Sequence, residues 1–286
     1  MYSQDSQLSA VQHTTLRIAR EIAVFCEEHG ILSYLCGGGA IGAVREGGFV
    51  PWDDDLDFFM PRADYERFCA LWPREASKQF VLERPSANFV NHNNFTTIRD
   101  RESTFIKTYQ TDLDIVHGIA VDVFPLDVAP NKPGKQRMQK IWAMVYALFS
   151  EQLIPETHGT AIKLGSSALL GLFHSRSARY RVWHFAEKRM MAYQNRRTGL
   201  VTELCVGPQY MGNIYPQAWF ASATWLKFED TMLPLPVGYD AYLTKVFGNY
   251  HQRPSLAHQK PHHDAVLIDP TKSFEEYRGS YFLKKR

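Results

Sequence analysis

The stretch Leu35-Cys-Gly-Gly-Gly-Ala-Ile-Gly-Ala-Val-Arg-Glu-Gly-Gly-Phe-Val-Pro-Trp-Asp-Asp-Asp-Leu-Asp-Phe-Phe-Met60 joins glycines after one predicted strand to acids before the next. The apolar run 31–36 predicts a strand that leads into Gly37, Gly38 and Gly39, and residues 40–46 predict a short helix. Glycines at such a junction let backbone N–H groups approach an anion, and a helix N-terminus favours negative charge. We therefore predict that these three glycines bind phosphate.

Aspartates crowd the start of the second predicted strand, 56–60, in Asp53-Asp54-Asp55-Leu56-Asp57. Alternate side chains on a strand share a face, so Asp55 and Asp57 would project together while Leu56 faces the core. Two clustered carboxylates repel each other unless a cation lies between them. Hard oxygen ligands with room for phosphate favour Mg²⁺ or Mn²⁺.

A third carboxylate is expected on a neighbouring strand, and Asp122 in the apolar run 119–124 supplies it. A lone acid in such a strand is costly if it is buried without a partner. We therefore predict Asp55, Asp57 and Asp122 as catalytic and metal-binding residues. The alternative for any single aspartate is a helix cap or a surface turn.

The pattern of apolar residues predicts an α/β (α+β) fold in three consecutive parts. Strands and helices alternate in residues 1–130, the predicted catalytic core. Residues 131–199 read as a mainly helical insertion, and residues 200–286 as an irregular, aromatic-rich C-terminal part that completes the active site.

Composition narrows the class of protein. Of the 286 residues, 45% are hydrophobic and 22% are charged, which excludes a disordered, collagen-like or disulfide-stapled chain. The four cysteines lack the spacing of a zinc or redox motif, and they read as thiols of a reducing compartment. The first dozen residues lack a secretory pattern, and no apolar run approaches the roughly 20 residues that span a bilayer. We therefore expect a cytoplasmic protein.

Positive charge is concentrated in residues 131–199, which carry twelve Lys or Arg and three Asp or Glu, although the net charge of the whole chain is only +2. Basic and apolar residues together suit an anionic membrane surface, which predicts peripheral attachment at the inner face of the cell membrane. The alternative is a solvated helix pair whose apolar residues cover the catalytic sheet. Nucleic acid is not expected, because no nucleic-acid-binding motif accompanies the charge. The predicted membrane contacts are Arg137, Lys140, Arg176, Arg179 and Arg181.

Residues 37–68, GGGAIGAVREGGFVPWDDDLDFFMPRADYERF, resemble the signature of the LicD family of phosphotransferases, which is related to the fukutin family. Two later blocks resemble the family in the same order, at 121–127 and at 235–254. Two departures stand out. Many relatives have a single glycine followed by Thr or Ser where this chain has Gly37 to Gly39, and an acid is more usual at Asn249.

The resemblance implies a nucleotidyltransferase-like mixed sheet and a metal-dependent phosphotransferase. Its substrates would be CDP-choline and a lipid-linked glycan acceptor of teichoic acid or lipopolysaccharide type. Phosphocholine would pass to a sugar hydroxyl and CMP would leave. Two alternatives stay open: transfer of another phospho-alcohol (phosphoethanolamine, glycerol phosphate or ribitol phosphate), and a nucleotidyltransferase that uses an NTP.

The same resemblance suggests further substrate contacts. Arg45 would counter phosphate charge, or would pair with Asp53 or Asp54 instead, and Trp52 would stack on cytosine or pack in the core. A choline head is recognised by aromatic faces, and the alternative for each aromatic candidate is ordinary packing. The histidines of the C-terminal region, which include His263, would contact phosphate or acceptor, or lie on the surface. The candidates for the substrate head group and acceptor are Tyr210, Tyr215, Trp219, Trp225, His258 and His262.

Overall fold

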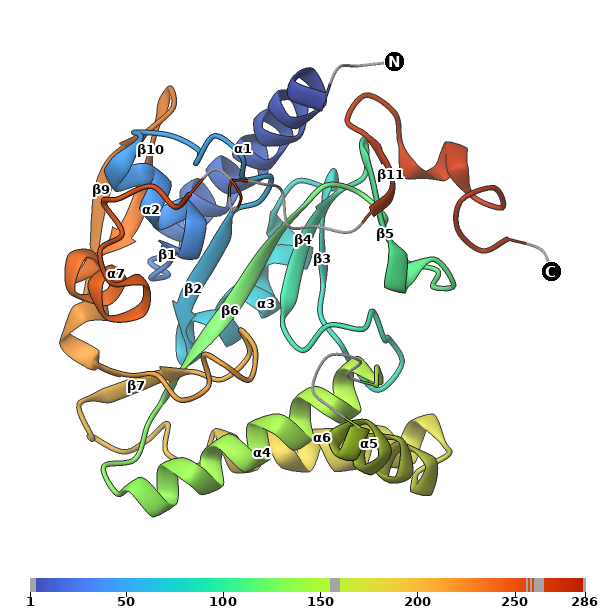
Figure 1. Ribbon diagram of the computed structural model, residues 1–286, viewed down its shortest axis with the longest axis vertical. Coiled ribbons are helices and arrows are strands. Elements are labelled where there is room, and N and C mark those ends of the chain that lie inside the picture. Colours follow the sequence, from blue (N-terminus) through green and yellow to red (C-terminus); the bar gives the residue numbers. More distant parts are fainter. Residues whose placement is uncertain (1–3, 155–159, 256, 258, 260–264, 285–286) are drawn as a thin grey trace. The chain divides into compact units, whose positions relative to one another are not determined.

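The computed structural model describes residues 4–154, 160–255, 257, 259 and 265–284 and separates into two compact units (Figure 1). Each unit is assembled from segments that are far apart in the sequence, whereas the sequence predicted three consecutive parts. The first unit comprises residues 1–83, 97–124 and 217–286, and the second comprises residues 84–96 and 125–216. The C-terminal residues join the first unit through contacts such as the hydrogen bond from Tyr34 Oη to the carbonyl of Phe220, 2.7 Å.

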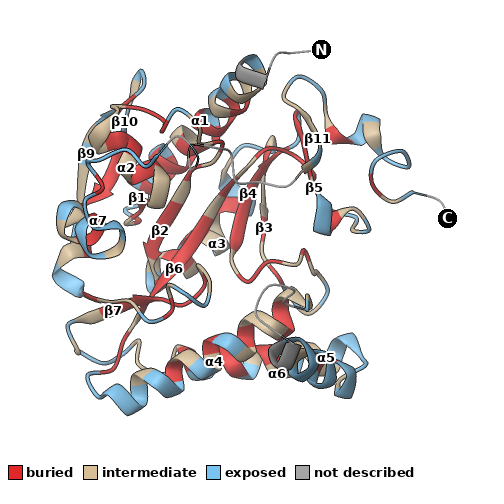
Figure 2. Cartoon of the chain, in the orientation of Figure 1, coloured by how far each residue is buried: buried red, intermediate tan, exposed pale blue. Residues whose placement is uncertain are grey.

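A sheet with the strand order β1-β2-β6-β4-β3 forms the centre of the first unit. Strands β1 and β2 are antiparallel, with Cys36 opposite Asp57, and β3 and β4 are also antiparallel. The middle strands are buried (Figure 2) because apolar side chains such as Phe59 and Val121 point into the core. This mixture of strands and helices confirms the predicted fold class. The strands are β1 (Tyr34–Cys36), β2 (Asp57–Pro61), β3 (Phe80–Glu83), β4 (Thr96–Asp100) and β6 (Ala120–Val128).

Aromatic rings join two helices of the first unit to each other. Helices α1 and α3 pack together through the ring of Phe25, whose centroid lies 5.9 Å from that of Phe68 and 4.9 Å from that of Trp72. The Trp72 indole N–H donates to the carbonyl of Phe80, 2.9 Å away, which ties α3 to β3. The helices are α1 (Gln4–Glu28), α2 (Gly37–Arg45), α3 (Arg62–Glu75) and α7 (Tyr239–Phe247).

The C-terminal region contains regular strands that the sequence did not reveal. Strands β9 (Ala223–Phe228) and β10 (Thr231–Pro236) form an antiparallel hairpin, and β11 (Ala265–Asp269) pairs with β5 (Thr104–Lys107). Prolines 234 and 236 made β10 a poor strand candidate, and the turn lacks glycine. Glu229 supplies the left-handed conformation of the turn, with φ of 53°.

The second unit is mainly helical. Helices α4 (Pro133–Glu151) and α6 (Arg176–Met190) pack together, and Gln139 donates from its side-chain amide to the carbonyls of Val128 and Met190. Helix α5 (Thr160–Leu172) lies between them in the sequence. Two short strands, β7 (Leu200–Glu203) and β8 (Ile214–Pro216), extend the last residues of β6. Within the described residues, no helix is both long and apolar enough to cross a membrane.

Helix α2 lies very close to the loop that leads to the aspartates, and Gly42 permits this approach. A Cβ atom at Gly42 would overlap the carbonyl oxygen of Gly48 and would lie 3.1 Å from the backbone nitrogen of Val50. Both neighbours are backbone atoms, which cannot turn away as a side chain can. The position of the loop therefore depends on the absence of a side chain at residue 42.

We predict that Gly42→Ala lowers the free energy of unfolding by about 1–3 kcal/mol, the usual cost of overpacking. Urea denaturation followed by tryptophan fluorescence measures this change. Gly165→Ala is the control, because Gly165 lies inside α5 with no atom within 4 Å of its added Cβ. That substitution should stabilise by about 0.5–1 kcal/mol. A Gly42→Ala protein as stable as the wild type would contradict the close approach.

Candidate active site

A small pocket in the first unit gathers acidic side chains from the sheet and from the loop before β2. It encloses about 20 Å³, room for one water molecule or one metal ion. Four of its lining residues are carboxylates, and Lys107 is the one basic residue among the described residues that line it. The full lining consists of Asp54, Asp55, Asp57, Phe105, Lys107, Gly118, Ile119, Ala120 and Asp122.

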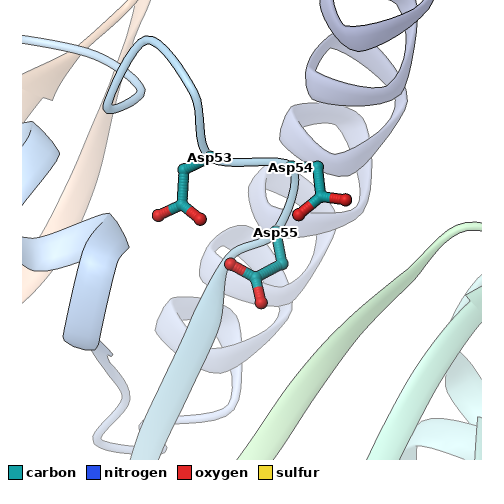
Figure 3. Close-up of side chains that lie close together, drawn as sticks. All are labelled: Asp53, Asp54 and Asp55. Carbon is teal, nitrogen blue, oxygen red and sulfur yellow. The ribbon is translucent and has the colours of Figure 1, made fainter. Parts of the chain in front are cut away.

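Three consecutive aspartates form the tightest carboxylate group among the described residues. Asp53, Asp54 and Asp55 each offer an oxygen, and these atoms lie within 4.8 Å of one another. Figure 3 shows the three side chains grouped where the loop enters β2. Asp57 is the first residue of β2, so Asp55 and Asp57 share a face of the extended chain. The sequence identified Asp55 and Asp57 but gave no role to Asp53 or Asp54.

Asp122 lies on β6, which neighbours β2 in the sheet. Its Oδ2 is 4.0 Å from Nζ of Lys107. Its Oδ1 is buried and accepts no hydrogen bond from the described part of the chain. A buried carboxylate oxygen without a donor is costly unless a cation approaches it.

The electrostatics of the pocket are dominated by Asp57. Burial raises the pKa of its carboxyl well above the usual value, and the nearby carboxylates of Asp55, Asp122 and Asp53 raise it further, while Lys107 opposes them. Burial by itself would lower the pKa of Lys107, but the attraction of carboxylates, chiefly Asp122, outweighs it and the pKa is raised. Lys107 therefore stays charged, and the carboxylates around it still exceed its single positive charge.

The pocket fits a hard divalent cation. Its donor atoms are carboxylate oxygens, which are the ligands that Mg²⁺ and Mn²⁺ prefer. A bound cation would give the buried oxygen of Asp122 a partner, and it would lower the raised pKa of Asp57. Asp55, Asp57 and Asp122, which the sequence singled out, all line the pocket, and Asp54 joins them.

The three glycines form the first turn of α2 itself, so the helix begins three residues earlier than the sequence predicted. Gly37 has the left-handed φ of 54°, and its N–H donates to Oη of Tyr242, 3.3 Å away. A Cβ at Gly38 would overlap the carboxylate of Asp53. The glycines therefore let an acidic side chain lie against the start of α2, where we had predicted phosphate. Phosphate binding by Gly37, Gly38 and Gly39 stays a prediction.

Arg45 has partners other than the expected Asp53 or Asp54. Its Nε lies 2.7 Å from a carboxylate oxygen of Glu46, and its Nη1 donates to the carbonyl of Tyr250, 3.0 Å away. The guanidinium carbon also lies 6.0 Å from the ring centroid of Trp52. The structure thus joins Arg45 and Trp52 to each other. Contacts of either with a nucleotide stay predictions.

The predicted aromatic residues are divided between the two units. Tyr210 and Tyr215 belong to the second unit, while Trp219 and Trp225 belong to the first. Tyr215 is fully buried and donates its hydroxyl to the carboxylate of Glu203, so it has a packing role. Trp225 lies on β9 and is partly exposed. His258, His262 and His263 lie outside the described residues.

Lys107 is a pocket residue that sequence reasoning missed. It ends β5, directly after Phe105 and Ile106. A lone charged residue in an otherwise apolar strand is the signal that identified Asp122, and applied to basic residues it would have identified Lys107 as well. The acidic motif drew attention to carboxylates, whereas the balancing cation comes from another strand.

Comparison with known proteins shows what the segment that contains this pocket is similar to. Residues 30–158 match the model of the family described as LicD/FKTN/FKRP, nucleotidyltransferase domain. The chain is also 25% identical, over 267 residues, to the lipopolysaccharide cholinephosphotransferase LicD of Haemophilus influenzae. That alignment covers 88% of this chain and 94% of the relative. All four pocket carboxylates and Lys107 lie within the matched segment. Both findings confirm the resemblance seen in the sequence: residues 30–158 are similar to the LicD family, and most of the chain is similar to one of its cholinephosphotransferases.

Proposed function

We propose that this protein is a transferase that moves phosphocholine from CDP-choline to a sugar hydroxyl of a cell-surface glycan precursor. The relative from Haemophilus influenzae, a lipopolysaccharide cholinephosphotransferase, aligns along most of both chains and supports this class of reaction. The choice of CDP-choline and of a teichoic acid or lipopolysaccharide acceptor is our inference from the family. A cytoplasmic location stays a prediction.

The observation that carries the proposal is the surplus of carboxylates around Lys107 in a pocket of ion size. In-line displacement at phosphorus requires charge neutralisation and alignment more than covalent chemistry. A bound Mg²⁺ or Mn²⁺ would supply Lewis-acid stabilisation of the phosphate oxygens. Asp55 and Asp57 are the proposed ligands, because both line the pocket and they alternate along the chain that enters β2.

Asp122 has two possible tasks, and Lys107 supports both. As a third ligand, Asp122 would complete the oxygen set with its buried Oδ1. As a general base, it would accept the proton of the attacking sugar hydroxyl. The ammonium of Lys107 lies 4.0 Å from Oδ2 and would hold the Asp122 carboxylate in place by electrostatic attraction in either case. Lys107 is therefore a positioning residue in this proposal.

We predict that Asp57→Asn abolishes transfer while the metal-free protein becomes more stable. The amide lacks the charge that holds a cation, but it also removes a buried carboxylate whose pKa is raised by burial and by its acidic neighbours. A raised carboxyl pKa means that ionisation disfavours the folded state. The gain in Tm should therefore be present above the ordinary Asp pKa and should disappear as the pH falls below it. Thermal melts in EDTA across pH, together with CMP release, measure both effects.

Asp112→Asn is the matched control, because Asp112 is an exposed residue of the same unit outside the pocket. It should change neither activity nor the pH dependence of Tm.

General-base contributions alone reach roughly 10²–10⁴-fold, so Asp122→Asn should also lower turnover by at least that order. Full activity of Asp57→Asn, or of the wild type in EDTA, would contradict the metal mechanism.

The leaving group distinguishes the proposed reaction from its alternatives. We predict that the protein with Mg²⁺ and a glycan acceptor releases CMP from CDP-choline, faster than from CDP-ethanolamine, CDP-glycerol or CDP-ribitol. Mass spectrometry of the acceptor should show added phosphocholine. Release of pyrophosphate from an NTP would identify a nucleotidyltransferase instead. If another CDP-alcohol were preferred, the proposed class of reaction would stand and the proposed substrate would be wrong.

A further inference from the structure

Helix α5 is an apolar helix with almost no burial. Its sequence, TAIKLGSSALLGL, holds one charged residue, Lys163. Leu164 and Leu172 are 66% and 70% exposed, and Leu169 is also exposed. A surface helix normally turns its apolar side toward the core and its polar side toward water. In α5 the leucine side chains are exposed to water instead, and an exposed apolar surface of this kind indicates a site of interaction.

Helix α4 also exposes apolar residues, in addition to those that it buries. Ala143, Tyr146 and Phe149 are buried together with the polar Gln139 and Ser150, and Met138, Ile141 and Met144 are exposed. These three residues recur every third position and therefore lie along one side of the helix. These three residues form an apolar strip that faces solvent although the helix has a packed partner in α6.

A ring contact continues this apolar surface from α4 to α6. The centroid of Trp142 on α4 lies 5.5 Å from that of Phe185 on α6, and the Phe185 side of the pair is 54% exposed. The guanidinium carbon of Arg189 lies 5.9 Å from the Trp142 ring. Exposed aromatic and aliphatic side chains thus adjoin a basic residue where the two helices meet.

The exposed charged residues of α4, α5 and α6 are basic. Within the described part of residues 131–199 the acids are Glu151 and Glu187. Glu187 is buried and paired with Arg84, 3.1 Å away, and Glu151 accepts a hydrogen bond of 2.7 Å from Asn94. Neither acid is exposed, while the basic residues are mostly at the surface. The exposed basic residues of α4, α5 and α6 are Lys135, Arg137, Lys163, Arg176, Arg181, Lys188 and Arg189.

We propose that helices α4, α5 and α6 dock the protein on an anionic membrane surface, with the exposed leucines of α5 in the interface and the basic residues at the lipid head groups. Exposed apolar residues combined with basic ones are the pattern of interfacial helices. Charge complementarity selects an anionic surface. A second copy of the same basic surface would be repelled, and a nucleic acid would not require exposed leucines.

This inference rests on the proposed function in one respect: a lipid-linked acceptor would lie at the membrane surface on which the protein docks.

The structure also corrects one of the membrane contacts predicted from the sequence. Arg179 donates to the carbonyls of Phe173 and Leu170 and to the side chain of Gln152, at 2.8–3.2 Å. These bonds hold the end of α5 to α6, so Arg179 is a structural residue. Arg137, Arg176 and Arg181 remain the predicted contacts, and Lys140 is half-buried.

Vesicle sedimentation of the full chain tests the proposal. The protein should sediment with phosphatidylcholine vesicles that contain phosphatidylglycerol, should not sediment with pure phosphatidylcholine, and should be released by high salt. Each basic residue near such a surface changes binding by roughly fivefold. Arg137→Glu combined with Arg181→Glu should therefore weaken binding by at least about tenfold. Leu164→Ser combined with Leu172→Ser should weaken it at both low and moderate salt.

Matched controls come from exposed residues of the first unit. Arg74→Glu with Lys227→Glu tests the change in total charge, and Val24→Ser with Val237→Ser tests the loss of exposed apolar side chains. Neither control should alter vesicle binding, and thermal melts should show that all variants fold. Sedimentation does not depend on transfer, so it can fail while CMP release with a water-soluble acceptor persists, and the reverse also holds.

Three outcomes would overturn the proposal. The first is no binding to anionic vesicles at low salt, or equal loss of binding in the control variants. The second is tighter binding to RNA or DNA than to vesicles at the same salt, which would assign the surface to nucleic acid. The third is self-association that the Leu164 and Leu172 substitutions abolish while vesicle binding is unchanged, which would assign it to a second copy.

Discussion

Repulsion among the carboxylates around Lys107 is the constraint on which the proposed chemistry depends. Four carboxylates line a pocket of ion size with a single ammonium beside them. Like charges this close cannot all stay ionised in a partly buried site without compensation. Burial and then repulsion from Asp55, Asp122 and Asp53 raise the pKa of Asp57, so that carboxyl must either take up a proton or gain a cation. We propose that a divalent cation provides the compensation.

The surrounding structure holds the acids in place against their repulsion. Ahead of the aspartates, the backbone N–H of Glu229 donates to the carbonyl of Gly47, 2.8 Å away, and the Glu229 carboxylate accepts from the N–H of Phe49, 3.0 Å away. Gln12 of α1 donates to the carbonyl of Asp53 at 2.7 Å. After the aspartates, the pairing of Asp57 with Cys36 fixes the start of β2. The C-terminal hairpin thus contributes to the site without supplying a pocket residue.

The sequence predicted the elements that depend on local pattern. Alternation placed Asp55 and Asp57 on one face, and an isolated acid in an apolar strand identified Asp122. The family resemblance supplied the class of reaction. Features that depend on contacts between distant residues were not predictable, because no local pattern records them. Lys107 of β5 lies 4.0 Å from Asp122 of β6, a strand of another sheet, and Arg45 donates to the carbonyl of Tyr250. The hairpin of β9 and β10 was hidden by its prolines and by a turn without glycine.

Direct measurement of metal binding tests the central claim without requiring a substrate. Mn²⁺ is suited to this because the free ion gives an electron paramagnetic resonance signal that decreases when it binds protein. Titration of the metal-free chain should show saturable binding that Mg²⁺ displaces and that Asp55→Asn and Asp57→Asn both weaken by at least about tenfold, since each removes a charged ligand. Asp112→Asn should bind as the wild type does. No saturable binding, or equal binding in the Asp55 and Asp57 variants, would contradict the account.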